Sequence, residues 1–478
     1  MYSSFGLYWN GNWQTASGKS IPVISPVTEE VLGEAPGATE ADTLQAIESA
    51  VSGTAQWRKV GAWERSRLLK KAADIMREKT EEMARWLTME LGKPLDQSEG
   101  EVGMAIEQFE WYAEETKRIN GQIMESRQPN GKVMIQHEPV GVVAALTSWN
   151  FPVVLAARKI APAIAAGCSV ILRPAEEAPG SVMSFIQCLH EVGFPSGVIN
   201  LINGYPDNVS PVLMSDKRVR KISLTGSTRV GKLLLKASAE TLKRTSMELG
   251  GHAPVIVYED ADVELVAEQA AIVKFKHCGQ VCASPSRYFI HKISVDAFSD
   301  KFIETTNKFK LGDGKDKGVD IGPLATEKRL EEVEQLVEET KKEGAKVLCG
   351  GQRPAGFNKG YFYEPTIFDN VKDNFKIMTV EPFGPLSPIT TFKSFDEVIK
   401  RANNHSAGLA GYVCTSSMDL AYKTSESLET GMVAVNTPLL SSAETPFGGI
   451  KESGYGREGG SMGINCLLYT SDAADERS

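Results

Sequence analysis

The sequence predicts an α/β protein whose central sheets are parallel and covered by helices. Two observations support this class. Short, wholly apolar segments rich in Val, Ile and Ala alternate with amphipathic segments over most of the chain, and a strand buried on both faces is apolar throughout rather than alternating. The chain has 478 residues, 42% of them hydrophobic. At roughly 100–200 residues per domain this length allows about two to four domains, each with its own core. The composition excludes collagen-like, disordered and disulfide-stapled chains.

The beginning of the chain is helical in pattern. Residues 41–90 are charged, poor in glycine and apolar at every third or fourth position, which predicts a pair of amphipathic helices. A Gly-Lys-Pro break follows at residues 92–94, and residues 100–118 predict a further helix.

From residue 141 the pattern changes to the alternation of a parallel sheet. We expect its strands at residues 141–146, 169–172, 198–202, 221–225 and 254–257 and its helices at 153–166 and 181–192. A second α/β set is expected from about residue 263, with helices at 263–275, 295–308 and 327–344 and strands at 286–290, 346–349 and 386–392. Residues 446–460, rich in Gly and Pro, are expected to form a loop, and the chain from about Cys466 is expected to be poorly ordered.

The composition also limits the partners. The chain carries 52 Lys and Arg against 61 Asp and Glu, a net charge of -9, so we expect neither nucleic acid nor an anionic membrane surface as a partner. Its apolar stretches fall far short of the ~18 residues of a membrane span, and the N-terminus does not resemble a secretory signal. Seven scattered cysteines, an odd number, fit free thiols in a reducing compartment, which favours the cytoplasm.

A glycine-containing turn, GSTRVGKL at residues 226–233, follows one expected strand. It nearly matches a nucleotide-triphosphate loop, but Leu233 stands where a hydroxyl must hold magnesium. Free N–H groups at a helix start could bind a phosphate or pyrophosphate; a plain turn with Ser or Thr as the N-cap is an equally good interpretation. Glu176, just after another expected strand, could accept hydrogen bonds from ribose hydroxyls or be only solvated.

Nucleophilic chemistry is suggested by the segment KHCGQVC at residues 276–282. The spacing of its histidine and cysteines suits zinc poorly, so we expect no metal site. Cys282, in a turn between a helix and a strand, could be a nucleophile if its pKa is lowered or a base lies nearby; a buried inert thiol is the alternative. Glu248 is the best candidate base, because its apolar neighbours raise a carboxyl pKa. The histidines form no recognisable triad.

Five motifs in register resemble the aldehyde dehydrogenase superfamily, and within it most of all the NAD(P)-dependent succinate-semialdehyde dehydrogenase group. The similarity runs from about residue 7 to 463, and its motifs are SWNFP at 148–152, the turn at Gly226 and Ser227, ELGG at 248–251, GQVC at 279–282 and EPFGP at 381–385. The resemblance implies a Rossmann-like cofactor-binding domain (1–117 and 139–249), an α/β catalytic domain (250–452), a small β oligomerisation element (118–138 and 453–470) and a disordered tail (471–478). A homodimer or homotetramer is implied as well. The usual family ending diverges here after Thr470, and we hypothesise that the tail is truncated or foreign.

The resemblance implies that the protein oxidises an aldehyde to a carboxylate with NAD(P). Cys282 would attack as a thiolate, and Asn150 with the backbone N–H of Cys282 would hold the oxyanion of the thiohemiacetal. Hydride would pass to the nicotinamide, and Glu248 would activate the water that hydrolyses the thioester. Cofactor contacts are implied at Trp149, Arg173, Glu176, Gly226, Ser227, Glu381 and Phe383. Arg173 stands where the family usually has Lys, and Glu176 beside it would repel a 2′-phosphate, so NAD is expected rather than NADP.

The resemblance further implies an ω-semialdehyde acid, such as succinate semialdehyde, as the substrate. Arg158 matches the arginine that binds the distal carboxylate, for which a guanidinium is suited by its two parallel hydrogen bonds; a helix-surface cation is the alternative. The other implied substrate contacts are Lys276, which replaces a second arginine, Ser441 or Ser442, and Phe447. Glutarate and 2-oxoglutarate semialdehyde stay open, as does a broad-range aldehyde dehydrogenase.

Four further expectations follow from individual positions. Ser284 replaces the second thiol of a disulfide switch, so that switch is not expected. An NTPase would need a hydroxyl at Leu233, and a CoA-acylating relative usually lacks the base that Glu248 supplies. A catalytically silent relative would lack Cys282 or Glu248.

Overall fold

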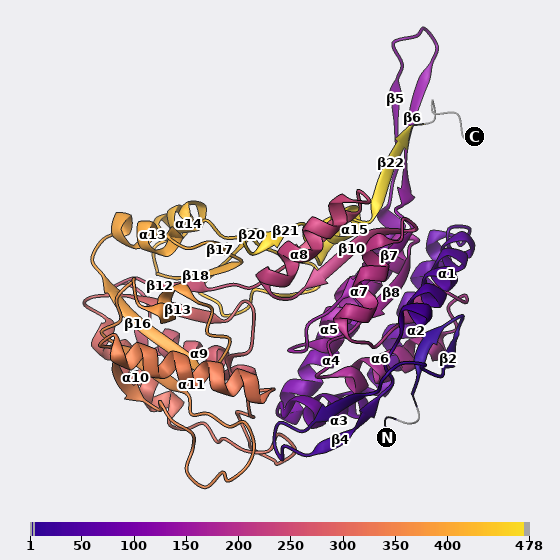
Figure 1. Cartoon of the computed structure of the whole chain (residues 1–478). Helices are drawn as coiled ribbons and strands as arrows, with labels where there is room; N and C mark the ends of the chain where they lie inside the picture. Colours follow the sequence, from indigo (N-terminus) through magenta and orange to yellow (C-terminus); the bar gives the residue numbers. More distant parts are fainter. Residues whose placement is uncertain (1, 3–4, 473–478) are drawn as a thin grey trace.

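The computed structural model describes residues 2 and 5–472 and has two large sheets and a small projecting one (Figure 1). The eight-stranded sheet, with its helices, lies on one side of the molecule, drawn in indigo to magenta, and the seven-stranded sheet on the other, drawn in orange. The large sheets are mainly parallel and helices pack on them, so the predicted α/β class is confirmed.

The eight-stranded sheet has the order β2-β1-β9-β8-β7-β10-β11-β21. Its strands are β1 (Leu7–Trp9), β2 (Asn12–Gln14), β7 (Val142–Leu146), β8 (Ser169–Arg173), β9 (Ile199–Leu201), β10 (Val219–Thr225), β11 (Arg244–Glu248) and β21 (Gly454–Tyr455). Strands β7 to β11 are parallel, and β7 and β8 are buried along their whole length, as their apolar sequences predict. The intervening helices are α5 (Pro152–Ala166), α6 (Pro179–Val192), α7 (Pro206–Ser215) and α8 (Thr228–Ala239).

In the helical N-terminal part, α1 (Glu40–Trp57) packs directly on this sheet, whereas α2 (Ala62–Glu78), α3 (Thr80–Leu91) and α4 (Leu95–Glu115) pack on α5 and α6. The short η2 (Thr116–Arg118) follows α4. The expected pair of helices over residues 41–90 is therefore wrong, since there are three. The first break is at Gly61. The second is at Lys79, where the backbone leaves the helical region although no glycine or proline marks the break in the sequence. Two short strands, β3 (Ile21–Ile24) and β4 (Val31–Ala35), precede these helices.

The seven-stranded sheet has the order β14-β15-β16-β13-β12-β18-β19. Its strands are β12 (Ala253–Val257), β13 (Pro285–His291), β14 (Lys346–Cys349), β15 (Thr366–Asp369), β16 (Leu386–Phe392), β18 (Ala410–Cys414) and β19 (Met432–Val435). The accompanying helices are α9 (Val263–Phe275), η3 (Lys276–Gly279), α10 (Val295–Thr306), α11 (Glu327–Lys342), α12 (Lys376–Thr379), α13 (Phe395–Asn403) and α14 (Met418–Ser427). Only β14 runs antiparallel to its neighbour in this described sheet.

The segment expected to be loop, residues 446–460, contains two short strands. They are β20 (Ile450–Lys451), which pairs with β17 (Ala407–Gly408), and β21, which extends the eight-stranded sheet beside β11. Two residues are too few for an alternating pattern to show in the sequence.

The projecting sheet has the order β22-β6-β5. It consists of β5 (Gln122–Glu125), β6 (Lys132–Pro139) and β22 (Leu468–Asp472), and β22 follows α15 (Gly460–Asn465). The expectation that the chain is poorly ordered from about Cys466 is wrong up to Asp472, because β22 pairs with β6 over five residues. The rest of the expected tail, residues 473–478, lies outside the described residues. Of the helices described, none combines the length and apolar character that a membrane span requires.

Candidate active site

The segment before Cys282 has an unusual backbone that places the thiol. His277, Cys278 and Gly279 have φ angles of 48°, 54° and 72°, in the left-handed region that costs a non-glycine residue about 1–2 kcal/mol. Gly279 is required twice over, since a Cβ atom there would lie 2.2 Å from the carbonyl oxygen of Gly384. Such a conformation persists only where its surroundings hold it.

Hydrogen bonds from three other segments hold this loop. The backbone N–H of His277 donates to Gln97 Oε1 at 2.9 Å, and Gln280 accepts from the Ala325 N–H at 2.9 Å while donating to the His277 carbonyl at 3.1 Å. Asn150 Nδ2 donates to the Gln280 carbonyl at 3.0 Å. The loop that precedes Cys282 is thereby tied to the side chain expected to form the oxyanion hole.

Cys282 lies in an acidic environment. Burial, followed by the negative charges of Glu248 and Glu381, raises the pKa of its thiol well above the usual value, and Arg158 acts in the opposite direction. To act as a nucleophile, Cys282 needs either a lowered thiol pKa or a base nearby. Since the pKa is raised, the base is what makes this thiol reactive.

Glu248 is that base by position. It is the last residue of β11 and is 3% exposed, and both its carboxyl oxygens are buried without a hydrogen-bond partner among the described residues. The charge of Glu248 acts on the Cys282 thiol and helps to raise its pKa. Burial and then the charge of Glu458 raise the Glu248 pKa to about 7, against the opposite effect of Lys159 and Arg158. A carboxyl group with this pKa can exchange protons near neutrality.

Sequence reasoning missed Lys159 and Glu458. They form a buried ion pair, and Ser223 on β10 lies beside it, with its Oγ 3.3 Å from Lys159 Nζ and 3.2 Å from Glu458 Oε1. Lys159 is adjacent to Arg158, and Glu458 is in the segment expected to be loop. Neither position carries a local signal, because a paired buried charge reads in sequence like a solvated one.

A pocket of about 180 Å³ opens beside Cys282. Arg158 projects from α5 into its wall, 6% exposed, which excludes the alternative of a helix-surface cation. Its guanidinium donates to Ser441 Oγ and lies 4.4 Å from the centre of the Phe447 ring. The lining residues are Met104, Asn150, Phe151, Val154, Leu155, Arg158, Val273, Lys276, Val281, Cys282, Ala283, Ser284, Tyr412, Pro438, Leu439, Leu440, Ser441 and Phe447.

Of the two candidate serines, the structure brings only Ser441 to the pocket. Ser442 is absent from the lining residues and its hydroxyl lies 3.1 Å from Thr445 Oγ1, so it stabilises its own turn instead. Lys276 does line the pocket, but it is an exposed residue, in contrast to Arg158.

Some of the residues expected to bind the cofactor lie at the carboxyl ends of the parallel strands of the eight-stranded sheet. The others lie in the segment after α12. Arg173 ends β8, pairs with Glu176 and donates to the Gly204 carbonyl at 3.0 Å. The Gly226 N–H donates to the Glu248 carbonyl, and Ser227 caps α8, as the N-cap interpretation predicts.

The opposite side of this region comes from the segment after α12. Trp149 packs edge-on against Phe383, with 5.5 Å between ring centres. Glu381 accepts from the Gly251 N–H at 3.2 Å, and burial raises its pKa to about 8. Trp149, Phe383 and Glu381 thus border the same region, although they come from distant parts of the chain.

Unpartnered polar atoms indicate that the residues present fit a dinucleotide. The parallel strands follow the order β9-β8-β7-β10-β11, which reverses between β7 and β10, and nucleotides bind at such a reversal. Among the described residues, Thr147 after β7, Thr225 at the end of β10 and Asn203 after β9 are buried with side-chain oxygens that have no hydrogen-bond partner. A buried polar group without a hydrogen-bond partner costs about 1–3 kcal/mol, and a bound polar ligand would supply the missing hydrogen bond.

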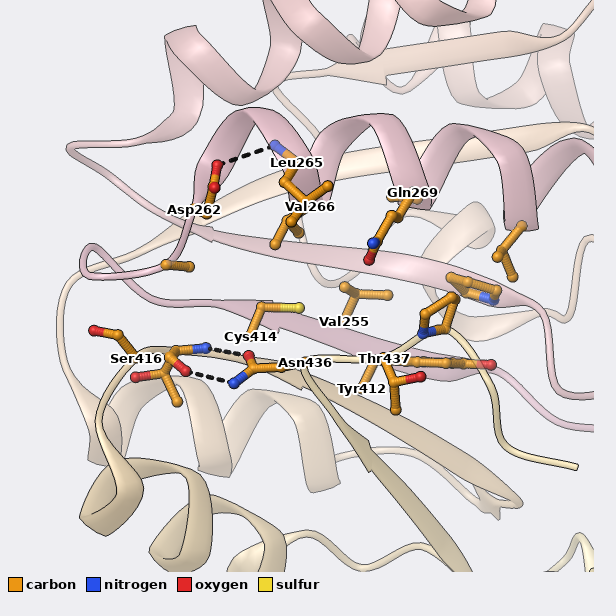
Figure 2. Close-up of a pocket in the computed structure, with 16 residues that line it drawn as sticks. Val255, Asp262, Leu265, Val266, Gln269, Tyr412, Cys414, Ser416, Asn436 and Thr437 are labelled. Atoms are coloured by element: carbon orange, nitrogen blue, oxygen red, sulfur yellow. Dashed lines mark hydrogen bonds between the residues drawn. The ribbon is translucent and has the colours of Figure 1, made fainter.

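A second pocket, of about 240 Å³, lies between α9, the strands β12 and β18 and the segment that follows β19 (Figure 2), and it shares Val273, Tyr412 and Pro438 with the first. Its most polar side chains stabilise the fold: Asp262 accepts from the Leu265 N–H at the start of α9, and Asn436 bonds both the N–H and the carbonyl of Thr415. We therefore assign the chemistry to the pocket at Cys282.

Comparisons with known proteins show the family of this chain. Residues 13–472 match the model of the aldehyde dehydrogenase family. Glutarate-semialdehyde dehydrogenase of Pseudomonas putida is 40% identical over 462 residues, which cover 96% of this chain and 95% of the relative. Succinate-semialdehyde dehydrogenase [NADP(+)] GabD of Escherichia coli is 39% identical over 460 residues, 96% of this chain and 95% of the relative. The crystal structure of succinate-semialdehyde dehydrogenase from Burkholderia pseudomallei superposes with a TM-score of 0.96 at 38% identity, over 98% of this chain and 97% of that one.

Proposed function

The chain belongs to the aldehyde dehydrogenase family, and from this premise we propose that it oxidises an ω-semialdehyde acid, such as succinate or glutarate semialdehyde, to the dicarboxylate with NAD(P). The observation that carries the substrate class is the charge of the pocket at Cys282. Arg158 and Lys276 line it, and no Asp or Glu is among its described lining residues. The remaining wall is mostly apolar, which suits the short methylene chain between an aldehyde and a carboxylate.

The acid–base chemistry starts with Glu248. With a pKa of about 7 it accepts the proton of the Cys282 thiol, whose own pKa is raised, and the thiolate sulfur bonds to the aldehyde carbon. The oxygen becomes an oxyanion, which Asn150 and the backbone N–H of Cys282 stabilise. One amide hydrogen of Asn150 is used by the Gln280 carbonyl, so the other is oriented and available.

Trp149, Ser227, Glu381 and Phe383 would hold the dinucleotide, with the carboxyl ends of β7, β9 and β10 beneath it. When bound, this cofactor accepts the hydride that leaves the aldehyde carbon. The acyl group is then a thioester of Cys282, and Glu248 removes a proton from the water that hydrolyses it. Hydrolysis releases the carboxylate and restores the thiol.

Preference for NAD over NADP is a separate proposal. The Arg173 guanidinium is already engaged by Glu176 and by the Gly204 carbonyl, and a second negative group beside Glu176 is disfavoured. The E. coli relative at 39% identity is named for NADP(+), so this chain would differ from that relative.

We also propose assembly as a homodimer or homotetramer through the sheet β22-β6-β5, in a reducing compartment such as the cytoplasm. Ile123, Met124 and Met134 on this projecting sheet are 71%, 51% and 43% exposed, a concentration of apolar surface that a partner surface would cover. All seven cysteines are free. Sedimentation of the purified chain tests the assembly, and a monomer at all concentrations would contradict it.

The substrate class is tested by steady-state kinetics of the parent protein. Succinate and glutarate semialdehydes are compared with butanal and pentanal, which have the same chain lengths without the carboxylate, each with NAD and with NADP. The expected result is a higher kcat/KM for the acids, through a lower KM. Equal values for acids and neutral aldehydes would indicate a broad-range aldehyde dehydrogenase instead.

A further inference from the structure

An ion pair that touches neither pocket lies fully buried near the active site. Lys93, between α3 and α4, pairs with Glu101 in the second turn of α4, and both side chains are 0% exposed. Removing two charges from water is costly, and the attraction between them offsets that cost only where further hydrogen bonds satisfy both groups. The remaining contacts of the pair therefore indicate its role.

Those contacts all reach one short segment, residues 150–154. Lys93 Nζ donates to the backbone carbonyl of Asn150 at 3.0 Å and lies 4.2 Å from the centre of the Phe151 ring. Glu101 Oε1 accepts from the backbone N–H groups of Val153 and Val154 at 2.9 and 3.3 Å.

This segment includes the first turn of α5, which has no cap of its own. Phe151 occupies the N-cap position without a side-chain hydrogen bond, and Pro152 follows it. The first N–H groups of a helix need acceptors, and a carboxylate there is also favoured by the helix dipole. Glu101 supplies that acceptor from another helix, while Lys93 donates to the carbonyl of Asn150, the residue before the N-cap.

Given the proposed function, we infer that Lys93 and Glu101 are positioning residues for the oxyanion hole. They hold the backbone of Asn150, whose side chain is oriented from its other end by the Gln280 carbonyl. The same pair sets the start of α5, the helix that carries Arg158 into the substrate pocket. Placing such a donor within about 1 Å matters, because a shift of that size can cost on the order of 100-fold in rate.

Glu90 offers a matched control within the chain. It is 1% exposed and accepts from the N–H groups of Gly180 and Ser181, both at 2.7 Å. It thereby caps α6, which also begins with a proline and lacks a cap of its own. Glu90 differs in two respects: α6 carries no residue of the pocket at Cys282, and among the described residues Glu90 has no cationic partner, so burial raises its pKa to about 7.

The test compares Lys93→Met/Glu101→Gln with Glu90→Gln. Both charges are replaced together so that neither stays buried alone. We expect kcat for the semialdehyde to fall by about 10- to 100-fold in the double variant, as for a displaced oxyanion donor. The rate of Cys282 alkylation by iodoacetamide, which needs no oxyanion hole, should stay unchanged. Glu90→Gln should lower the thermal midpoint but leave kcat near that of the parent.

A cycle with Asn150→Ala separates this inference from the proposed function. If the pair acts through Asn150, the double variant lowers kcat far less in the Asn150→Ala background. Full additivity, or a loss of kcat in Glu90→Gln as large as in the double variant, overturns the positioning role. If Asn150→Ala itself leaves kcat unchanged, the oxyanion role in the proposed function is wrong, and the positioning role fails with it.

Discussion

The two sides of Cys282 carry opposite charge. On the substrate side, Arg158 and Lys276 line a mostly apolar pocket without an acidic residue among its described lining. On the cofactor side, Glu248 is buried and Glu381 is half-buried, and their pKa values are raised to about 7 and about 8. A fixed cation can bind a charged group at any pH near neutrality, whereas these carboxyl groups can gain or lose protons there. One side is thus suited to recognition and the other to proton transfer.

The largest effect should come from the thiol that separates the two sides. Cys282→Ala should abolish aldehyde-dependent formation of reduced cofactor, because no other group can form the thioester. Cys278→Ala is the matched control: Cys278 lies in the same loop, but it is fully buried and its pKa is raised to about 12, so this variant should keep its activity. Turnover by Cys282→Ala would contradict the mechanism.

The acidic side is tested next through the pH profile. Only the ionised form of Glu248 accepts a proton, so kcat should rise as pH increases through about 7. Glu248→Gln should lower kcat by about 10²- to 10⁴-fold, as for loss of a general base. It should also remove this limb of the pH profile, the rise of kcat near pH 7. Glu381→Gln should weaken cofactor binding yet keep the limb near pH 7. A limb that persists in Glu248→Gln would assign the titration to another group.

The basic side is tested by Arg158→Met, which keeps the length of the side chain but removes its charge. Loss of hydrogen bonds to a charged group is worth about 1.5–3 kcal/mol, so kcat/KM for succinate semialdehyde should fall by about 10- to 100-fold. Butanal should be little affected. Steady-state kinetics with both aldehydes measures the difference, and equal losses for the two would reject a carboxylate site at Arg158.

Many of the residues in this comparison could be predicted from the sequence, because glycines or apolar runs near them mark their positions. Cys282 and Glu248 stand near Gly279 and Gly251, where another backbone approaches too closely for a Cβ atom. The buried strands β7 and β12 are apolar runs of five residues, and β8 has three apolar residues at its centre. Strands β1 to β4 are only three to five residues long, and β5 is exposed along its whole length. Their sequences therefore carry little periodicity.

The charged network of the site was not accessible in this way. Lys93, Glu101, Lys159 and Glu458 are each paired in the interior, and their partners are 8 and 299 residues apart. A single lysine or glutamate in a sequence reads as a solvated residue unless its tertiary contact is known. The choice between Ser441 and Ser442 depended likewise on the turn at Thr445.

The smallest effect should come from Lys276. This residue is exposed although it lines the pocket. Exposed charges contribute roughly 0.2–1 kcal/mol, so Lys276→Met should lower kcat/KM for semialdehyde acids by at most about fivefold. Salt should separate it further from Arg158: the screening length is about 10 Å at 0.1 M and about 3 Å at 1 M. At 1 M salt the effect of Lys276→Met should vanish while that of Arg158→Met persists, since Arg158 is buried. If both effects vanish together, the substrate side acts by long-range attraction alone and the contrast between a binding side and a proton-transfer side no longer holds.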